Sequence, residues 1–150
     1  MSETHDNAKL DDLIVTLIDS VKGFEHSAEK AEAARYREFF VDMARERREA
    51  VNLLQTASRA EGGTPADYGS AAATLHRRIE DLRVALGGGD AAIVREVERG
   101  EDYLKEEFER VLADERMSPA AMAAVREAYG SVRRGHDKAS ALKHELESAT

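Results

Sequence analysis

The amino-acid sequence predicts an all-α protein: a four-helix bundle of two antiparallel hairpins, joined by a long crossover that contains a fifth, shorter helix. Three observations favour this fold. Apolar residues recur at helical three-and-four spacing over long stretches. No stretch shows the period of two that marks a half-buried strand. The composition, with 42% hydrophobic and 35% charged residues, two Pro and no Trp, is typical of a helical protein with a charged surface.

The first three helical segments follow from apolar periodicity and from the residues that interrupt it. One segment runs from about 7 to 31 and a second from about 35 to 60, where a Gly-Gly pair ends it. Ser70 can cap a shorter helix over 70–86, which three consecutive glycines break. This short helix belongs to the crossover, residues 64–89.

The last two helical segments begin at recognisable capping residues. Asp90 can cap a fourth segment that runs to about residue 112. Ser118 followed by Pro119 fits a cap and the first helical position of a final segment that runs to about residue 146. The four long segments therefore form two hairpins, one on each side of the crossover.

Length, charge and residue types restrict the function. The 150 residues suit one domain, residues 1–150, with residues 1–6 and 148–150 expected to be flexible. A formal net charge of −8 argues against nucleic acid and membrane partners, because both need a basic face. The absence of cysteine excludes disulfides and thiolate metal sites. No membrane-span or signal-peptide pattern is visible, so we expect a cytoplasmic protein.

Each long helical segment carries one potential metal ligand on its apolar stripe. Glu46 lies three residues after Met43 and four before Ala50, where a core residue belongs. Corresponding positions on the other three stripes are occupied by Glu25, Glu101 and His136. Burying an unpaired charge is costly, so these residues need a compensating partner.

The same residues fall at one height of the bundle if the crossover returns the chain along its length. Glu25 and Glu46 each lie about ten residues from the turn near Arg35, and Glu101 lies about eleven residues from that end. A crossover helix of roughly 16 residues spans about 24 Å, enough for this return. The second and fourth helical segments are then predicted to run parallel.

Five stretches carry a resemblance to a known family: LIVTLIDSVKGFEHSAE, ARERREAV, LHRRIEDLRVAL, VERGEDY and HDKASALK. Together they resemble a bacterial ferritin-like four-helix-bundle family that is catalogued as a domain of unknown function. That family is distantly similar to rubrerythrin-like and ferritin-like di-iron proteins. In those proteins two helices supply one Glu each and the other two supply a Glu-x-x-His pair each.

The resemblance implies iron or manganese as the cofactor and assigns roles to individual residues. Glu25 matches the first single Glu, and Glu46 matches the Glu of the first pair. Glu101, or Glu98 one turn earlier, matches the second single Glu. The expected fold is accordingly ferritin-like.

Two departures from the family pattern weaken this metal site. Glu49 stands where the first pair would end in His, although its oxygen atoms suit iron or manganese. Arg133 stands where the second pair would begin with Glu, three residues before His136. A guanidinium is no ligand, and its charge repels a cation. We therefore expect Arg133 to neutralise Glu98 or Glu101. Together with His136 it is expected to supply the positive charge that compensates Glu46 and the carboxylates near it, leaving room for at most one weakly held metal ion.

Three functions remain open, and no catalytic residue is assigned. The favoured one is a ferritin-like bundle with a degenerate di-metal site and a non-enzymatic binding or stress-associated role. The alternatives are an iron- or manganese-binding protein with oxidase or peroxidase activity, and a helical scaffold that acts through self-association or a protein partner. A homodimer is predicted because Leu13, Leu17 and Ile18 widen the apolar face of the first segment.

Overall fold

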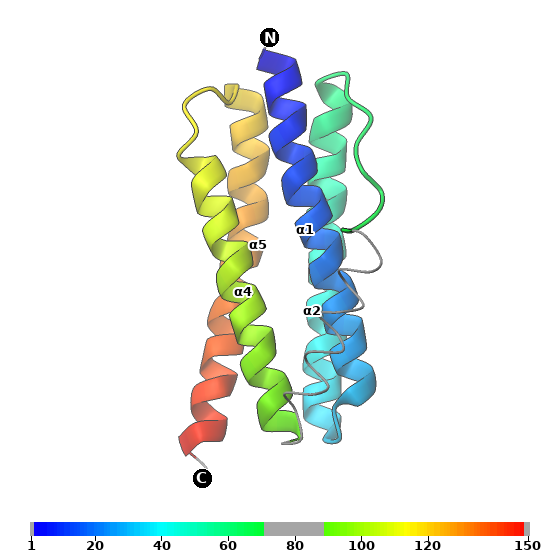
Figure 1. Cartoon of the computed structure of the whole chain (residues 1–150), viewed down its shortest axis with the longest axis vertical. Helices are drawn as coiled ribbons and strands as arrows, with labels where there is room; N and C mark the ends of the chain where they lie inside the picture. Colours follow the sequence, from blue (N-terminus) through cyan, green and yellow to red (C-terminus); the bar gives the residue numbers. More distant parts are fainter. Residues whose placement is uncertain (1, 71–88, 149–150) are drawn as a thin grey trace.

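The computed structural model describes residues 2–70 and 89–148, and all regular secondary structure in these residues is helical. The helices are α1 (Ser2–Lys30), α2 (Ala34–Ala60), α4 (Asp90–Leu112) and α5 (Pro119–Ser148). They pack side by side as an elongated bundle (Figure 1). The predicted all-α class is confirmed. None of the helices in the described residues is long and apolar enough to cross a membrane.

The direction of the helices confirms that the second and fourth helical segments of the prediction run parallel. In Figure 1, α1 and α5 run down the bundle, whereas α2 and α4 run up it and are therefore parallel. α1 and α2 form one antiparallel hairpin, α4 and α5 form the other, and the two hairpins meet along α1 with α4 and α2 with α5. The predicted crossover helix over 70–86 lies, apart from Ser70, outside the described residues and stays a prediction.

The apolar core has two parts, one toward each end of the bundle. The larger part surrounds Leu17, Phe108 and Val125. The smaller part surrounds Phe24 and Phe40, whose ring centroids are 6.4 Å apart. On every helix the residues of the two parts occupy separate stretches of sequence. The core is therefore interrupted at mid-bundle, which is the level where the sequence predicted convergent polar residues.

The apolar face of α1 is buried within the bundle of this one chain. Leu13 and Leu17 are fully buried in the core, and Ile18 packs against it. The segment after α2 also covers α1, because the Ala66 N–H donates to an Asp11 carboxylate oxygen at 3.1 Å. The homodimer stays a prediction, but the residues that suggested it are accounted for within one chain.

Helix ends follow the sequence signals in part. Gly62 adopts a φ of +79° just after α2, and the Ser118 hydroxyl accepts the Ala121 N–H at 3.3 Å at the start of α5, as expected. Asp90, however, does not cap its own helix, because Gly89 holds the N-cap position. The Asp90 carboxylate instead accepts hydrogen bonds from the turn between α1 and α2.

Residues 2–6, which are expected from the sequence to be flexible, lie within a helix, and their flexibility stays a prediction. α1 begins at Ser2, so the segment is helical. The His5 imidazole lies 2.7 Å from an Asp114 carboxylate oxygen, and the buried Asp6 carboxylate accepts the Ser118 N–H at 3.0 Å. These contacts fasten the start of α1 to the connection between α4 and α5.

Candidate functional site

The centre of the bundle holds a buried ion pair between Arg47 of α2 and Glu101 of α4, here called the central ion pair. Arg47 Nη1 donates to Glu101 Oε2 at 2.8 Å, and Nη2 donates to Oε1. Nη1 also donates to the Ser20 hydroxyl of α1 at 2.9 Å. The guanidinium carbon lies 5.4 Å from the centroid of the Phe24 ring, within the range of a cation–π interaction. The pair thus connects three helices.

The last helix, α5, has a glycine where it passes the central ion pair, and this leaves room for the Arg47 side chain. Gly135 is buried, and a Cβ atom built on it would collide with the Arg47 guanidinium and the Met43 methyl group. The same Cβ would lie 3.1 Å from Glu101 Oε1. A larger residue at position 135 would therefore displace the central ion pair.

Arg47 takes the inward position that the sequence assigned to Glu46. Both residues fit the stripe. Glu46 lies three residues after Met43 and four before Ala50, whereas Arg47 lies four after Met43 and three before Ala50. In the structure the Arg47 side chain is fully buried, whereas the Glu46 side chain is 33% exposed. The expectation that Glu46 points into the core is wrong, because the buried residues of α2 turn position 47 inward.

Glu46 lies at the boundary between α2 and α5. Its Oε1 atom is 3.4 Å from Lys138 Nζ, and its buried Oε2 atom has no hydrogen-bond partner among the described residues. Lys138, and not the expected pair of Arg133 and His136, therefore provides the nearby positive charge.

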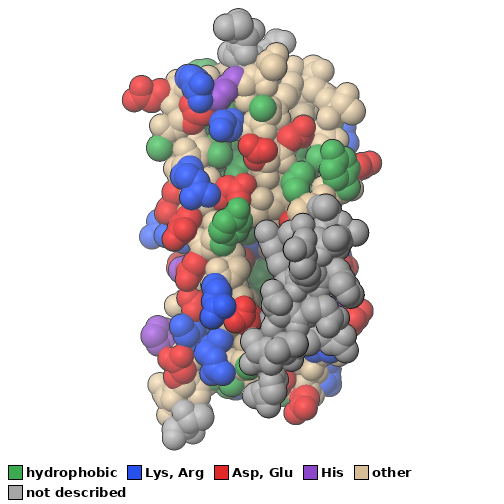
Figure 2. All heavy atoms as spheres, viewed as in Figure 1, with side chains coloured by type: hydrophobic (Ala, Val, Ile, Leu, Met, Phe, Trp, Pro, Cys, Tyr) green, Lys and Arg blue, Asp and Glu red, His purple; other side chains and the backbone are tan. Residues whose placement is uncertain are grey.

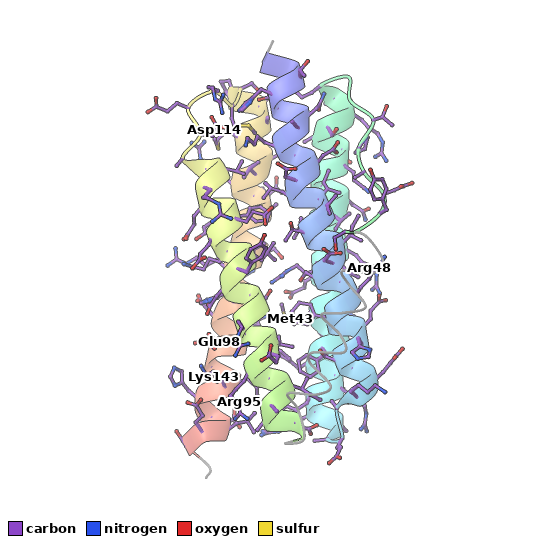
Figure 3. The ribbon with its side chains drawn as sticks, viewed as in Figure 1. Met43, Arg48, Arg95, Glu98, Asp114 and Lys143 are labelled. Atoms are coloured by element: carbon purple, nitrogen blue, oxygen red, sulfur yellow. The ribbon has the colours of Figure 1, made fainter. Side chains whose placement is uncertain are left out.

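Glu25 and Glu49 are also misplaced by the sequence prediction. Both are exposed, and Glu25 pairs with Arg48 on the outside of the first hairpin. Figure 3 shows Arg48 on the side of the bundle formed by that hairpin. Phe24, next to Glu25, takes the buried position on α1, so the carboxylate of Glu25 lies about a third of a turn away from the interior.

Arg133 does not enter the interior. It is exposed on α5, where its charge acts on Glu109 and Tyr129. The prediction that Arg133 neutralises Glu98 or Glu101 is wrong, because Arg47 neutralises Glu101 and Lys143 lies 2.9 Å from Glu98.

His136 belongs to a cluster on the seam between α4 and α5. Its Nε2 atom lies 2.5 Å from Asp102 Oδ1. Glu98, one turn before Asp102, completes the group, and one donor atom from each of the three residues lies within 4.8 Å of the others. We call Glu98, Asp102 and His136 the seam cluster. Glu98 and His136 are among the residues that the sequence predicts for a metal site, whereas Asp102, which lies off the apolar stripe of α4, is not.

The described residues do not fit a di-metal centre at mid-bundle. Glu25 and Glu49 are exposed, and both Glu101 oxygen atoms accept hydrogen bonds from Arg47. A guanidinium repels metal cations and cannot coordinate them. The donors that remain, in the seam cluster, lie on one face of the second hairpin and suit at most one ion.

A polar groove of about 470 Å³ lies between α1 and α4. Thr16 donates a hydrogen bond shared by both Glu107 carboxylate oxygens, at 3.0 and 3.1 Å. Burial raises the pKa of Glu107. Lys9 and Arg110 lie at the same groove, and on the face drawn in Figure 2 acidic and basic side chains are interspersed. The groove therefore offers no surface of a single charge.

Two antiparallel hairpins around a buried ion pair define an all-helical bundle protein with a polar centre. Within that class, the chain belongs to the family described as Domain of unknown function (DUF2383), whose family model matches residues 7–114. The match includes most of α1, all of α2 and α4, and both partners of the central ion pair. Gly135 and His136 lie beyond it. Neither the curated proteins nor the solved structures contain a match.

Proposed function

We propose that this chain is a ferritin-like helical bundle in which an ion pair replaces the di-metal site, and that it has a non-enzymatic binding or stress-associated role. The main support for this proposal is that the buried Arg47 side chain donates to both carboxylate oxygens of Glu101 at the centre of the bundle. The Arg47 guanidinium supplies to Glu101 the positive charge that metal ions would supply in a ferritin-like centre. The parallel course of α2 and α4 supports the ferritin-like assignment, because a long connection between two hairpins distinguishes that arrangement.

The chemistry of the central ion pair supports a role without catalysis at that position. An arginine side chain stays protonated at all relevant pH values, so it does not act as a general acid or base. Unlike iron or manganese, it also has no second oxidation state. The pair is also enclosed, with Arg47 fully buried and Glu101 2% exposed. A substrate would have to break a bidentate ion pair to reach either group. Binding by this protein is accordingly expected at its surface.

The oxidation of Fe²⁺ in air tests this proposal. The parent protein, at several concentrations, is mixed with ferrous iron, and the formation of Fe³⁺ is followed by absorbance against buffer alone. We expect that the protein does not raise the rate of Fe²⁺ oxidation in the way a two-iron site would, with saturation at two iron ions per chain. The variant His136→Gln is the control, because any effect of the seam cluster disappears with it. Saturable acceleration that persists in His136→Gln would overturn the proposal and favour the oxidase or peroxidase alternative.

A further inference from the structure

We propose that Glu98, Asp102 and His136 form a surface site for one divalent transition-metal ion, of which Zn²⁺, Mn²⁺ and Fe²⁺ are the chemically suited candidates. The site lies on the seam between α4 and α5, apart from the central ion pair. It therefore goes beyond the proposed function, and either proposal can fail while the other stands.

Helix geometry brings the three donors together. Glu98 and Asp102 are four residues apart on α4, so their side chains share one face of the helix. His136 projects from α5 onto that face, with its Nε2 atom 2.5 Å from Asp102 Oδ1. Donor atoms around a tetrahedral ion with bonds of about 2.1 Å lie about 3.4 Å apart. The three donor atoms lie within 4.8 Å of one another, which is close to this spacing.

The packing of the cluster combines fixed donors with an open side. The Glu98 and His136 side chains are only 14% and 18% exposed, so the surrounding helices restrict their positions. The Asp102 side chain is 48% exposed and leaves access from solvent. A site with three protein ligands of this kind keeps further coordination positions for water.

The donor set suits borderline divalent ions. One imidazole nitrogen and two carboxylate oxygens favour Zn²⁺, Mn²⁺ or Fe²⁺, because carboxylates suit harder ions and imidazole suits zinc and iron. A third carboxylate, Asp137, lies 3.5 Å from His136 Nδ1, the ring nitrogen that would not bind the metal. Such a partner holds the ring orientation and increases its basicity as a ligand.

The electrostatics of the cluster also favour a cation. Lys143 Nζ lies 2.9 Å from Glu98 Oε2, so the cluster already attracts one positive charge. Figure 3 shows Glu98 and Lys143 together on the side of the bundle formed by the second hairpin. Lys143 is a partly exposed ammonium on a flexible stem, so a divalent ion can displace it. The lysine is a competitor for the site and not a part of it.

Isothermal titration of the full chain with Zn²⁺ tests the proposal. We expect one ion per chain for the parent. His136→Gln and Asp102→Asn each weaken binding by at least about tenfold, because each removes a ligand from a three-ligand site. His144→Gln, at an exposed histidine two turns further along α5, leaves the affinity unchanged. Lys143→Met tightens binding by several fold, whereas Lys138→Met, which removes a lysine paired with Glu46, does not.

Circular dichroism of each variant establishes that it is folded, and an NMR titration of the parent supplies evidence that needs no variant. The His136 ring resonances are expected to shift or broaden with Zn²⁺ before those of His144. Two results would overturn the proposal: no saturable Zn²⁺ binding by the parent, or equal Zn²⁺ affinity in the parent and in His136→Gln. The second result would show diffuse attraction to an acidic surface.

Discussion

At the residue scale, Arg47 and Glu101 are each costly to bury alone and stable only as a pair. The Arg47 guanidinium has hydrogen bonds to Glu101 and Ser20, although its Nε atom has no partner among the described residues. A buried charge that loses its partner destabilises a protein far more than the intact pair stabilises it. Substitutions at these two positions should therefore be strongly non-additive.

The variant Arg47→Met should lower the free energy of unfolding by about 3–5 kcal/mol, because it leaves the Glu101 carboxylate buried without a partner. The double variant Arg47→Met with Glu101→Leu should recover most of this loss, since two apolar side chains need no partner. Urea denaturation measures both. Arg133→Met is the control, and at this exposed position the change should stay within about 0.5 kcal/mol. Equal costs at positions 47 and 133 would contradict the buried pair.

The variant Gly135→Ala should destabilise the protein by about 1–3 kcal/mol, because the added methyl group overpacks the central ion pair. Gly100→Ala is a matched control within α4. A Cβ atom at Gly100 meets nothing within 4 Å, so alanine there should stabilise the helix by about 0.5–1 kcal/mol. Thermal unfolding of the two variants should thus give shifts of opposite sign. A stabilising Gly135→Ala would show that α5 does not approach Arg47 closely.

At the scale of the elements, side chains from one hairpin complete the helix ends of the other. The Asp90 carboxylate at the start of α4 accepts the N–H groups of Glu32 and Ala33 at 2.7 and 2.9 Å. The N-cap of α2, Ala33, makes no side-chain hydrogen bond of its own. The second hairpin therefore supplies the acceptor for two N–H groups that precede the first turn of α2.

The variant Asp90→Ala should lower stability by about 0.5–2 kcal/mol, because it removes the acceptor of two partly exposed hydrogen bonds. Amide hydrogen exchange should locate the loss in the turn before α2 and not only at the start of α4. Asp90→Asn keeps one acceptor oxygen and should fall between the parent and Asp90→Ala. If exchange accelerates only within α4, Asp90 acts within its own helix and the contact between hairpins is not formed.

A second contact between elements gives stability a defined pH dependence. The backbone N–H of Arg116 and the His5 side chain lower the pKa of Asp114 from 3.8 to about 2. A lowered pKa in the folded state contributes stability that is fully present above the unfolded value and is lost as the pH falls through the folded value. Asp114→Asn should therefore be less stable than the parent above about pH 4, and this difference should disappear toward pH 2. Urea denaturation between pH 2 and 7 measures the difference. A gap that stays constant over this range would contradict the lowered pKa.

At the scale of the whole molecule, the helices and the parallel course of α2 and α4 could be predicted because many residues agree on them. Apolar spacing over more than twenty residues fixes a helix, and Gly62 and the Ser118–Pro119 pair mark ends that the structure confirms. The parallel course of α2 and α4 followed from the register of the polar positions, which stays nearly the same whichever of two neighbouring residues points inward.

The interior of the site could not be predicted in the same way. A helical stripe admits both the three-residue and the four-residue step, so the spacing from Met43 to Ala50 allows Glu46 or Arg47 equally. The prediction took the three-residue step from Met43 and so placed the carboxylate inward. The apolar residues Ala44 and Val51, three residues before and four after Arg47, share its face of the helix and were the sequence signal that could have decided for arginine. Gly135 was a further signal, since a glycine in mid-helix often marks a close approach of another group.

The number of metal ions retained by the folded chain tests the central claim most directly, which is that an ion pair fills the place of a di-metal site. The parent and His136→Gln are loaded anaerobically with Fe²⁺ or Mn²⁺, freed of excess metal, and measured by native mass spectrometry. The account predicts at most one ion on the parent and none on His136→Gln. Two ions per chain that persist in His136→Gln would contradict it, because such ions would have to occupy the interior that Arg47 fills.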